Sequence, residues 1–226
     1  MNFCETWPVE LCMPMNKSII VTRPNHDSRT RYLCAWSEEV IKIARDRNMD
    51  VYDLKGKKSK RSIFESYINA KNPAFIFLNG HGNQNVITGH ENEPIVDETS
   101  NLEEKIIYAR SCDAGQILGH RLVENGSKSF IGYKRKFIWG YLPGKVTRPL
   151  EDDIARLFLE PSNLVASTLI KNHTTKEAHD RSKNAMYKNF LKMVSSVATY
   201  EERYTARWLW SNINSQVLLG DQEGRI

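Results

Sequence analysis

Cys112 and His81 stand at the ends of two apolar runs that have the composition of buried strands. The run Ile-Ile-Tyr-Ala precedes Cys112 at residues 106–109, and Ala-Phe-Ile-Phe-Leu precedes His81 at residues 74–78. A cysteine thiolate is a nucleophile, and a neighbouring imidazole can take its proton and later deliver it to a leaving amine. Because the carboxyl ends of strands in an open α/β sheet are where sites form, the pair predicts nucleophilic catalysis at one sheet edge.

Such a reaction also needs hydrogen-bond donors for the negative charge that develops on the attacked carbonyl oxygen. Gly82 has no Cβ to block approach, and Cys112 lies at a strand-to-helix turn. We therefore predict that the backbone N–H groups of Gly82 and Cys112 form an oxyanion hole. Either turn alone is a weak signal, since a cysteine after a strand is more often a small buried apolar residue. Their joint occurrence in neighbouring strand–helix units favours catalysis.

The surrounding elements alternate between short apolar strands and helices, which predicts an α/β sandwich with a mostly parallel sheet. Strands are expected at residues 17–22, 49–54, 74–78, 106–110 and 128–133, and a small polar hairpin at 85–97. From residue 148 onward the pattern is helical, with helices predicted at 150–159, 161–171, 175–197 and 200–218. We expect an irregular lead-in at 1–16 and one domain at 17–226, made of an α/β catalytic core (17–147) and a helical part (148–226).

Composition limits the classes of function. The chain of 226 residues is 40% hydrophobic, which is enough for a real core, and its net charge of +5 is low for a dedicated nucleic-acid binder. Among its four cysteines, Cys4, Cys12, Cys34 and Cys112, no CxxC pair occurs, so no metal site is predicted. No apolar run approaches the roughly 18 residues that a membrane span needs. We expect a cytoplasmic protein with reduced thiols and no membrane insertion.

An apolar strand ending in His-Gly, followed by a strand ending in Ser-Cys-Asp-Ala-Gly, resembles the caspase-like (clan CD) cysteine peptidases. The polar hairpin after the histidine and the closing Leu-Leu-Gly-Asp at 218–221 look most like the gingipain and CHAT-domain branch. The resemblance implies a caspase-like three-layer α/β/α sandwich, with His81 as general base, Cys112 as nucleophile, Gly82 as oxyanion donor and no cofactor. The sequence departs from the caspase signature, because Arg-Ser-Cys replaces Gln-Ala-Cys, and the histidine-to-cysteine spacing of 31 residues is shorter than the roughly 50 of caspases.

Related enzymes use the residue two before the cysteine to line the pocket for the side chain that precedes the cut. The resemblance therefore places Arg110 in that pocket, where it would favour an acidic partner, with Lys134 and Arg135 adding to the same charge. In the alternative interpretation, Arg110 points away and pairs with the acidic hairpin, and Asp113 faces a basic substrate residue. Both interpretations remain open from the sequence.

The main hypothesis is a cysteine endopeptidase that hydrolyses a specific protein partner through an acyl-enzyme. The resemblance implies a prokaryotic regulatory or antiviral-defence protease, for example one that activates a gasdermin-like pore former or acts with a CRISPR system. We expect activation by a partner chain or by self-cleavage in the exposed segments 55–61 or 134–145. The alternatives are a non-catalytic caspase-like interaction module and a basic α/β nucleic-acid-binding protein, although direct nucleic-acid binding is not expected.

Overall fold

The computed structural model describes residues 17–226, so the predicted lead-in at 1–16, with Cys4 and Cys12, lies outside the described residues. Within that range a six-stranded sheet has the order β2-β1-β3-β6-β7-β8, in which all neighbours are parallel except β7 and β8. Its strands are β1 (Ser18–Arg23), β2 (Asp50–Lys55), β3 (Phe75–Asn79), β6 (Ile106–Arg110), β7 (Ser129–Tyr133) and β8 (Gln216–Gly220). The predicted fold class is confirmed.

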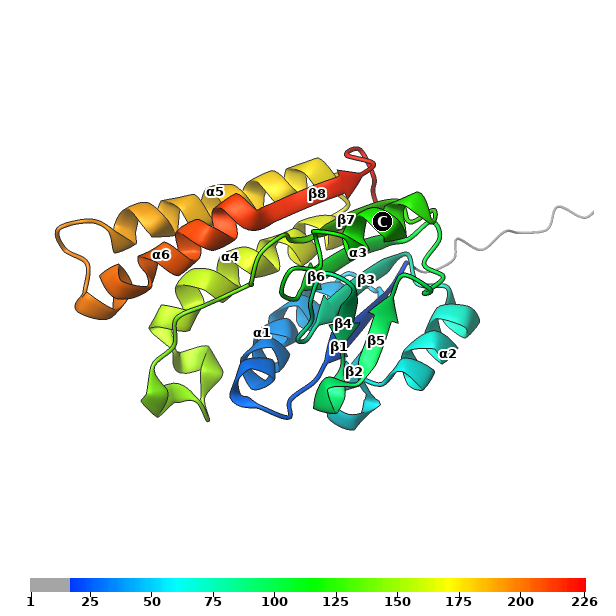
Figure 1. The fold of residues 1–226 in the computed structure, drawn as a ribbon, viewed down its shortest axis with the longest axis horizontal. Coiled ribbons are helices and arrows are strands. Elements are labelled where there is room, and N and C mark those ends of the chain that lie inside the picture. The colour runs from blue at the N-terminus through cyan, green and yellow to red at the C-terminus, as the bar shows by residue number, and fades with distance from the viewer. Residues whose placement is uncertain (1–16) are drawn as a thin grey trace, which may run out of the picture.

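Helices cover both faces of this sheet (Figure 1). One face packs against α1 (Ser28–Arg45) and α4 (Asp153–Ile170). Helix α4 packs in turn against α5 (Thr175–Met193), which contacts α6 (Tyr200–Ser215). The other face is covered by α2 (Arg61–Lys71), α3 (Leu118–Glu124) and the predicted hairpin, formed by β4 (Val86–Thr88) and β5 (Pro94–Asp97). Short 3-10 turns occur at Gly56–Lys58, His90–Asn92, Pro143–Lys145 and Pro149–Glu151.

Neighbouring residues of the central strands belong to different cores, because side chains alternate across a strand. Phe75 and Phe77 lie in the core under α1 and α4, while Ile76 and Leu78 lie in the core under α2 and the hairpin. All four are fully buried. A strand buried on both faces requires an uninterrupted apolar run, which is why these strands could be recognised from the sequence.

The C-terminal part differs from the prediction in one element. Residues 216–220 form β8, not the last turns of a helix, and they pair antiparallel with β7. The pairing satisfies the backbone groups along the edge of β7, and Gln216 also donates from Nε2 to the hydroxyl of the buried Tyr133 at 3.1 Å. The predicted helical part at 148–226 therefore also contains one strand, β8, which completes the sheet of the core.

Two helices predicted at 150–159 and 161–171 are one helix, α4, which continues through Pro161. A proline inside a helix removes the N–H that would bond to the carbonyl four residues earlier. Here that carbonyl belongs to Leu157, and the side-chain amide of Asn189 on α5 donates to it at 2.8 Å. A partner from another helix thus replaces the missing bond, which sequence pattern alone does not reveal.

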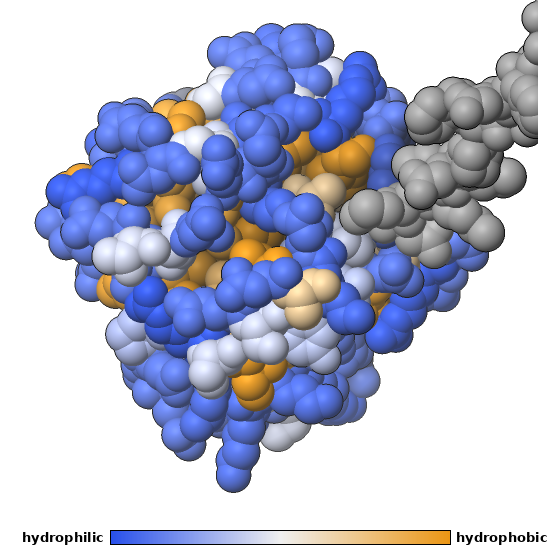
Figure 2. Space-filling view, turned by 90° about the vertical axis from the view of Figure 1, so that its right-hand side faces the viewer, coloured by the Kyte–Doolittle hydropathy of each residue, from blue (hydrophilic) through white to orange (hydrophobic). Residues whose placement is uncertain are grey.

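The surface seen in Figure 2 is mostly hydrophilic, with smaller hydrophobic areas between the polar side chains. Between residues 17 and 226, no helix has the length and apolar character that crossing a membrane requires. The basic segment 55–61, predicted as an exposed loop, contains a 3-10 turn and the start of α2, and its Ser59 is fully buried.

Candidate active site

His81 and Cys112 lie at the same edge of the sheet, as predicted. His81 follows β3 and Cys112 follows β6, and these two strands pair directly, with Asn79 opposite Arg110 at their carboxyl ends. Both residues line one cavity of about 260 Å³. The parallel register therefore brings together two side chains that are 31 residues apart in the sequence.

Cys112 is a free, partly buried thiol. Burial raises its pKa above the ordinary value, and the negative charge of Asp113 adds to the rise, whereas the positive charges of Lys136 and Arg29 oppose it. Its Sγ lies 4.0 Å from the carbonyl oxygen of Phe137, and the described residues offer it no other hydrogen bond. At neutral pH the free protein therefore holds Cys112 as a thiol, and a base is required to make it nucleophilic.

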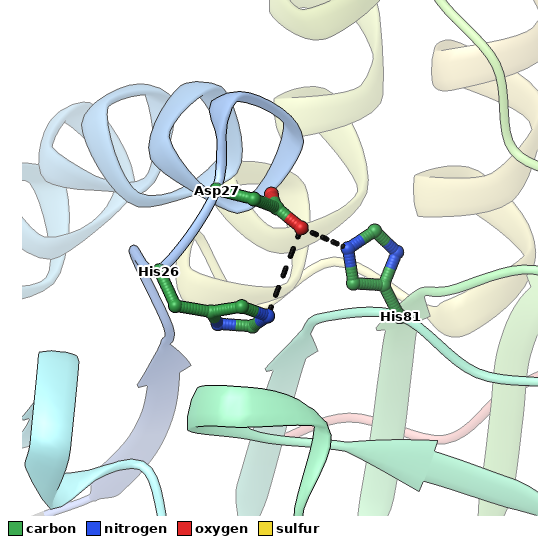
Figure 3. A group of neighbouring side chains, drawn as sticks. All are labelled: His26, Asp27 and His81. Atoms are coloured by element: carbon green, nitrogen blue, oxygen red, sulfur yellow. Dashed lines mark hydrogen bonds and ion pairs between the residues drawn. The ribbon is translucent and has the colours of Figure 1, made fainter.

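His81 is held by a carboxylate from the loop after β1. Its Nε2 lies 2.6 Å from Oδ2 of Asp27, and Figure 3 shows the other ring nitrogen directed away from that carboxylate. Asp27 is the N-cap of α1, because its Oδ1 accepts hydrogen bonds from the backbone N–H and the hydroxyl of Thr30. Burial acts to raise the pKa of Asp27, but the hydrogen bonds from Thr30 and His81 outweigh it and hold the pKa at about 2.

An ionised Asp27 fixes the state of the imidazole. Because a carboxylate only accepts hydrogen bonds, Nε2 of His81 must carry a proton, and Nδ1 of the neutral ring is left as the acceptor. A ring in this tautomer can take a proton from a group in the cavity. The sheet order puts β1 directly beside β3, which explains how a residue after β1 reaches the histidine after β3.

His26 extends the same network. Its Nε2 is 3.7 Å from Oδ2 of Asp27, and its ring lies 5.9 Å from that of His81 and 5.3 Å from that of His90. His26, Asp27 and His81 are spaced closely enough to hold a metal ion. However, the backbone N–H of Glu91 donates to Nδ1 of His26, so the proton of the neutral ring sits on Nε2, which makes that nitrogen a donor and not a ligand.

The two predicted oxyanion donors are close in space. A Cβ added to Gly82 would lie less than 3.0 Å from both Oγ of Ser111 and the carbonyl oxygen of Val86, so the contact between the two turns requires glycine. Ser111 in turn donates from Oγ to the carbonyl oxygen of His81 at 2.9 Å. The backbone N–H groups of Gly82 and Cys112 donate to no acceptor in residues 17–226.

Arg110 lines the cavity, but acceptors within the protein already occupy its side chain, so its role as a substrate contact stays a prediction. Its side chain is fully buried and extends toward α1 and α4. Burial lowers its pKa to about 10, which leaves it charged at neutral pH. All of its nitrogens are occupied by neutral acceptors, which are Oδ1 of Asn79, Oγ of Ser162, Oδ1 of Asn163, the carbonyl of Leu33 and Oγ of Ser37. The alternative, in which Arg110 points away and pairs with the acidic hairpin, is wrong, because none of these acceptors belongs to the hairpin.

Asp113, Lys134 and Arg135 do not line the cavity beside Cys112, so the prediction that they form this pocket is also wrong. Lys134 and Arg135 are exposed, and the backbone N–H of Lys134 is tied to the carbonyl of Ser215 at the end of α6. The loop that follows β7 does reach the cavity, but through residues 136–139 and not through Lys134 and Arg135.

Two functional candidates were missed in the sequence, namely Asp27 and Arg29. Asp27 has the form of an N-cap and also follows a strand of the sheet, but only the strand order shows that it reaches His81. Arg29 lines the cavity from the first turn of α1. The available signal was their place at the carboxyl end of the first strand, the same edge that carries the cysteine and the histidine.

Comparison with solved structures identifies the fold. A structure described as "Structure of Protease" superposes with a TM-score of 0.55 at 12% identity, over 93% of this chain and 48% of that one. The complex of the Porphyromonas gingivalis RgpB pro- and mature domains gives a TM-score of 0.57 at 9% identity, over 92% of this chain and 47% of that one. The chain thus has a gingipain-like, caspase-like α/β fold and spans about half the length of these structures. No protein-family model and no curated protein matches it.

Proposed function

We propose that the protein is a cysteine endopeptidase in which Cys112 is the nucleophile, His81 the general base and Asp27 the residue that orients His81. The observation that carries the proposal is the 2.6 Å contact between Nε2 of His81 and Oδ2 of Asp27, in a histidine that shares a cavity with Cys112. A nucleophile, a base and a group that orients the base are the three parts of an activated-nucleophile site. The likeness to protease structures supports it at the level of the fold.

The reaction follows from these parts. Nδ1 of His81 takes the proton of the Cys112 thiol as Sγ bonds to the carbonyl carbon of the substrate. The N–H groups of Gly82 and Cys112 donate to the resulting oxyanion. The carbon–nitrogen bond then breaks while the imidazolium gives its proton to the leaving amine, which leaves a thioester on Cys112. Water, deprotonated by His81, attacks the thioester and releases the acid, and the proton returns to Sγ.

The raised pKa of Cys112 fits this sequence of steps. A thiol that is neutral in the free protein does not exist as a stable ion pair with His81, so the proton must move during substrate attack. The contact of Sγ with the Phe137 carbonyl has to be exchanged for one with His81 in the same step. Catalytic hydrogen bonds are often long in a free enzyme and shorten in its complex.

A thiol-directed probe tests the proposal. We expect an iodoacetamide-based probe or a peptidyl acyloxymethyl ketone to label Cys112, with the label located by mass spectrometry and strongly reduced in His81→Ala. Cys34 serves as an internal control, because it is free but buried. We also expect the protein to cleave members of a peptide library and the Cys112→Ala variant to cleave none of them. A Cys112 that reacts equally fast with and without His81 contradicts the proposal.

The second candidate is a non-catalytic interaction module on the same fold. The observation that favours it is the orientation of Sγ toward the Phe137 carbonyl. This candidate predicts that no cleavage depends on Cys112 and that the probe labels Cys112 equally in the parent protein and in His81→Ala. A gasdermin-like or other defence substrate, an activating partner and self-cleavage at 55–61 or 134–145 remain predictions, as does the cytoplasmic location.

A further inference from the structure

The cavity beside Cys112 carries positive charge and no negative charge. Its lining contains Arg29, Lys136 and the buried Arg110, but no aspartate or glutamate. Arg110 is already bonded to neutral acceptors, whereas the side chains of Arg29 and Lys136 form no hydrogen bond or ion pair with any residue in 17–226. Both lie near the nucleophile, since their charges act on the pKa of Cys112. The cavity therefore offers two free cations.

The position of the cavity identifies the substrate group that would enter it. The residue that precedes the cut bond carries its side chain on the Cα atom next to the carbonyl carbon that Sγ attacks. That side chain must lie in a hollow adjoining the nucleophile, and this cavity is lined by both Cys112 and His81. Its volume of about 260 Å³ is below the roughly 300–1,000 Å³ of sites that enclose a whole small molecule, which suits a single side chain.

Arg29 is held in place by aromatic rings. Its guanidinium lies 5.4 Å from the ring centroid of Trp139 and 5.5 Å from that of Tyr141, within the range of cation–π contacts. It stands in the first turn of α1, where the helix dipole disfavours a cation and favours an anion. A guanidinium fixed there lowers the stability of the fold. An anionic substrate group bound against it would offset this unfavourable interaction with the helix dipole.

Trp139 supplies a third donor. Its side chain is 3% exposed and lines the cavity, and its Nε1–H has no hydrogen-bond partner among the described residues. A buried indole N–H normally has an acceptor. A carboxylate could accept from this donor and from a cation at once, because it has two oxygens. The apolar walls formed by Leu33 and Phe137 suit the methylene groups that carry it.

We propose that the protein cleaves after aspartate or glutamate, with the substrate carboxylate bound by Arg29, Lys136 and Nε1–H of Trp139. The inference rests on the proposed protease function. A basic side chain would enter a cavity with no counter-charge and meet two cations. Asp113, which the alternative interpretation of the sequence placed opposite a basic substrate residue, does not line the cavity.

Cleavage of matched peptides tests the preference. A fluorogenic series would differ only in the residue before the cut, which would be Asp, Glu, Asn, Gln, Arg or Lys. We expect kcat/KM for an acidic residue to exceed that of its amide by at least about tenfold, since a site built for one charged hydrogen bond discriminates by about tenfold to a hundredfold. Equal or greater kcat/KM for the Arg or Lys peptide would overturn the proposal.

Variants of the two cations assign the effect. Arg29→Gln combined with Lys136→Gln should reduce the acid-to-amide ratio by about tenfold to a hundredfold, with the amide peptide much less affected. The matched control is Arg31→Gln with Lys134→Gln, which removes two exposed charges from the same helix and loop outside the cavity. Trp139→Phe should lower the ratio by a smaller factor. An unchanged acid-to-amide ratio in the Arg29→Gln, Lys136→Gln variant would overturn the assignment of these two cations to the substrate carboxylate.

A binding arm separates this inference from the proposed function. In the Cys112→Ala chain, calorimetry with uncleaved peptides should show tighter binding of the acidic peptide than of its amide, and the Arg29→Gln, Lys136→Gln changes should abolish the difference. If no peptide is cut and Cys112 is not labelled, but the acidic peptide still binds more tightly than its amide, the protease function fails and the acidic site stands. If peptides are cut without any charge preference, the protease function stands and the acidic site fails.

Discussion

Asp27 and His81 are joined by a 2.6 Å contact between Oδ2 and Nε2, although 54 residues separate them in the chain. The same aspartate uses its other oxygen to cap α1. One carboxylate thus fixes both the start of a helix and the tautomer of the histidine. The cap makes the carboxylate rigid, so the imidazole is oriented before any substrate arrives.

Asp27→Asn should reduce kcat/KM by roughly 10²–10⁴, because a side-chain amide can donate to Nε2 and thereby hold the ring in the wrong tautomer. Asparagine is as good an N-cap as aspartate, so the stability of α1 should change little. Steady-state kinetics and denaturant unfolding measure the two effects separately. Asp27→Ala is the contrasting variant, since it should also lose about 0.5–2 kcal/mol of stability. Full activity in Asp27→Asn would show that the contact does not orient the base.

The pH dependence of Cys112 alkylation should reflect its charged neighbours. Because burial raises its pKa, the thiolate forms only at higher pH, and the midpoint of iodoacetamide alkylation should lie above the ordinary value of about 8.5. Removing the cations in Arg29→Gln, Lys136→Gln should move the midpoint further up. Asp113→Asn removes a negative charge and should move it down. Shifts in the same direction for both changes would contradict this account.

Gly82→Ala should abolish most of the activity and destabilise the domain. The added Cβ would clash with Oγ of Ser111 and with the Val86 carbonyl, which forces apart the two turns that carry the histidine and the cysteine. Gly144→Ala is the matched control, because a Cβ there meets no atom within 4 Å. Thermal unfolding and probe labelling of Cys112 check both variants. A fully active Gly82→Ala would exclude the tight contact and the oxyanion role built on it.

Arg110→Met should destabilise the fold and should change the acid-to-amide ratio less than the Arg29→Gln, Lys136→Gln double variant, because acceptors within the protein already bind its guanidinium. The change leaves buried oxygens of Asn79 and Asn163 without donors, and each unsatisfied group costs about 1–3 kcal/mol. The free energy of unfolding is measured by chemical denaturation. Lys134→Met, on the exposed loop, should stay within about 0.5 kcal/mol of the parent protein. If the acid-to-amide ratio fell as far in a folded Arg110→Met protein as in that double variant, Arg110 would be a direct contact of the substrate carboxylate.

The sequence by itself determined the parallel sheet and the Cys112–His81 pair. Strands buried on both faces need continuous apolar runs, such as residues 75–78, and parallel strands deliver their following turns to one edge. The secondary structure of the C-terminal part was harder to predict from the sequence. Whether residues 216–220 continue a helix or pair as β8 depends on the free edge of β7, which local sequence does not contain.

Tertiary structure decided which charged side chains belong to the site. Arg110 lines the cavity and is adjacent to the active-site turn in sequence, yet neutral acceptors on β3, α1 and α4 already bind its guanidinium. Asp27 and Arg29 are remote in sequence, yet the order of β1 beside β3 brings them to His81 and to the cavity. Residue types and periodicity fix local structure, whereas strand order and the side of the sheet that each residue faces depend on packing of the whole chain.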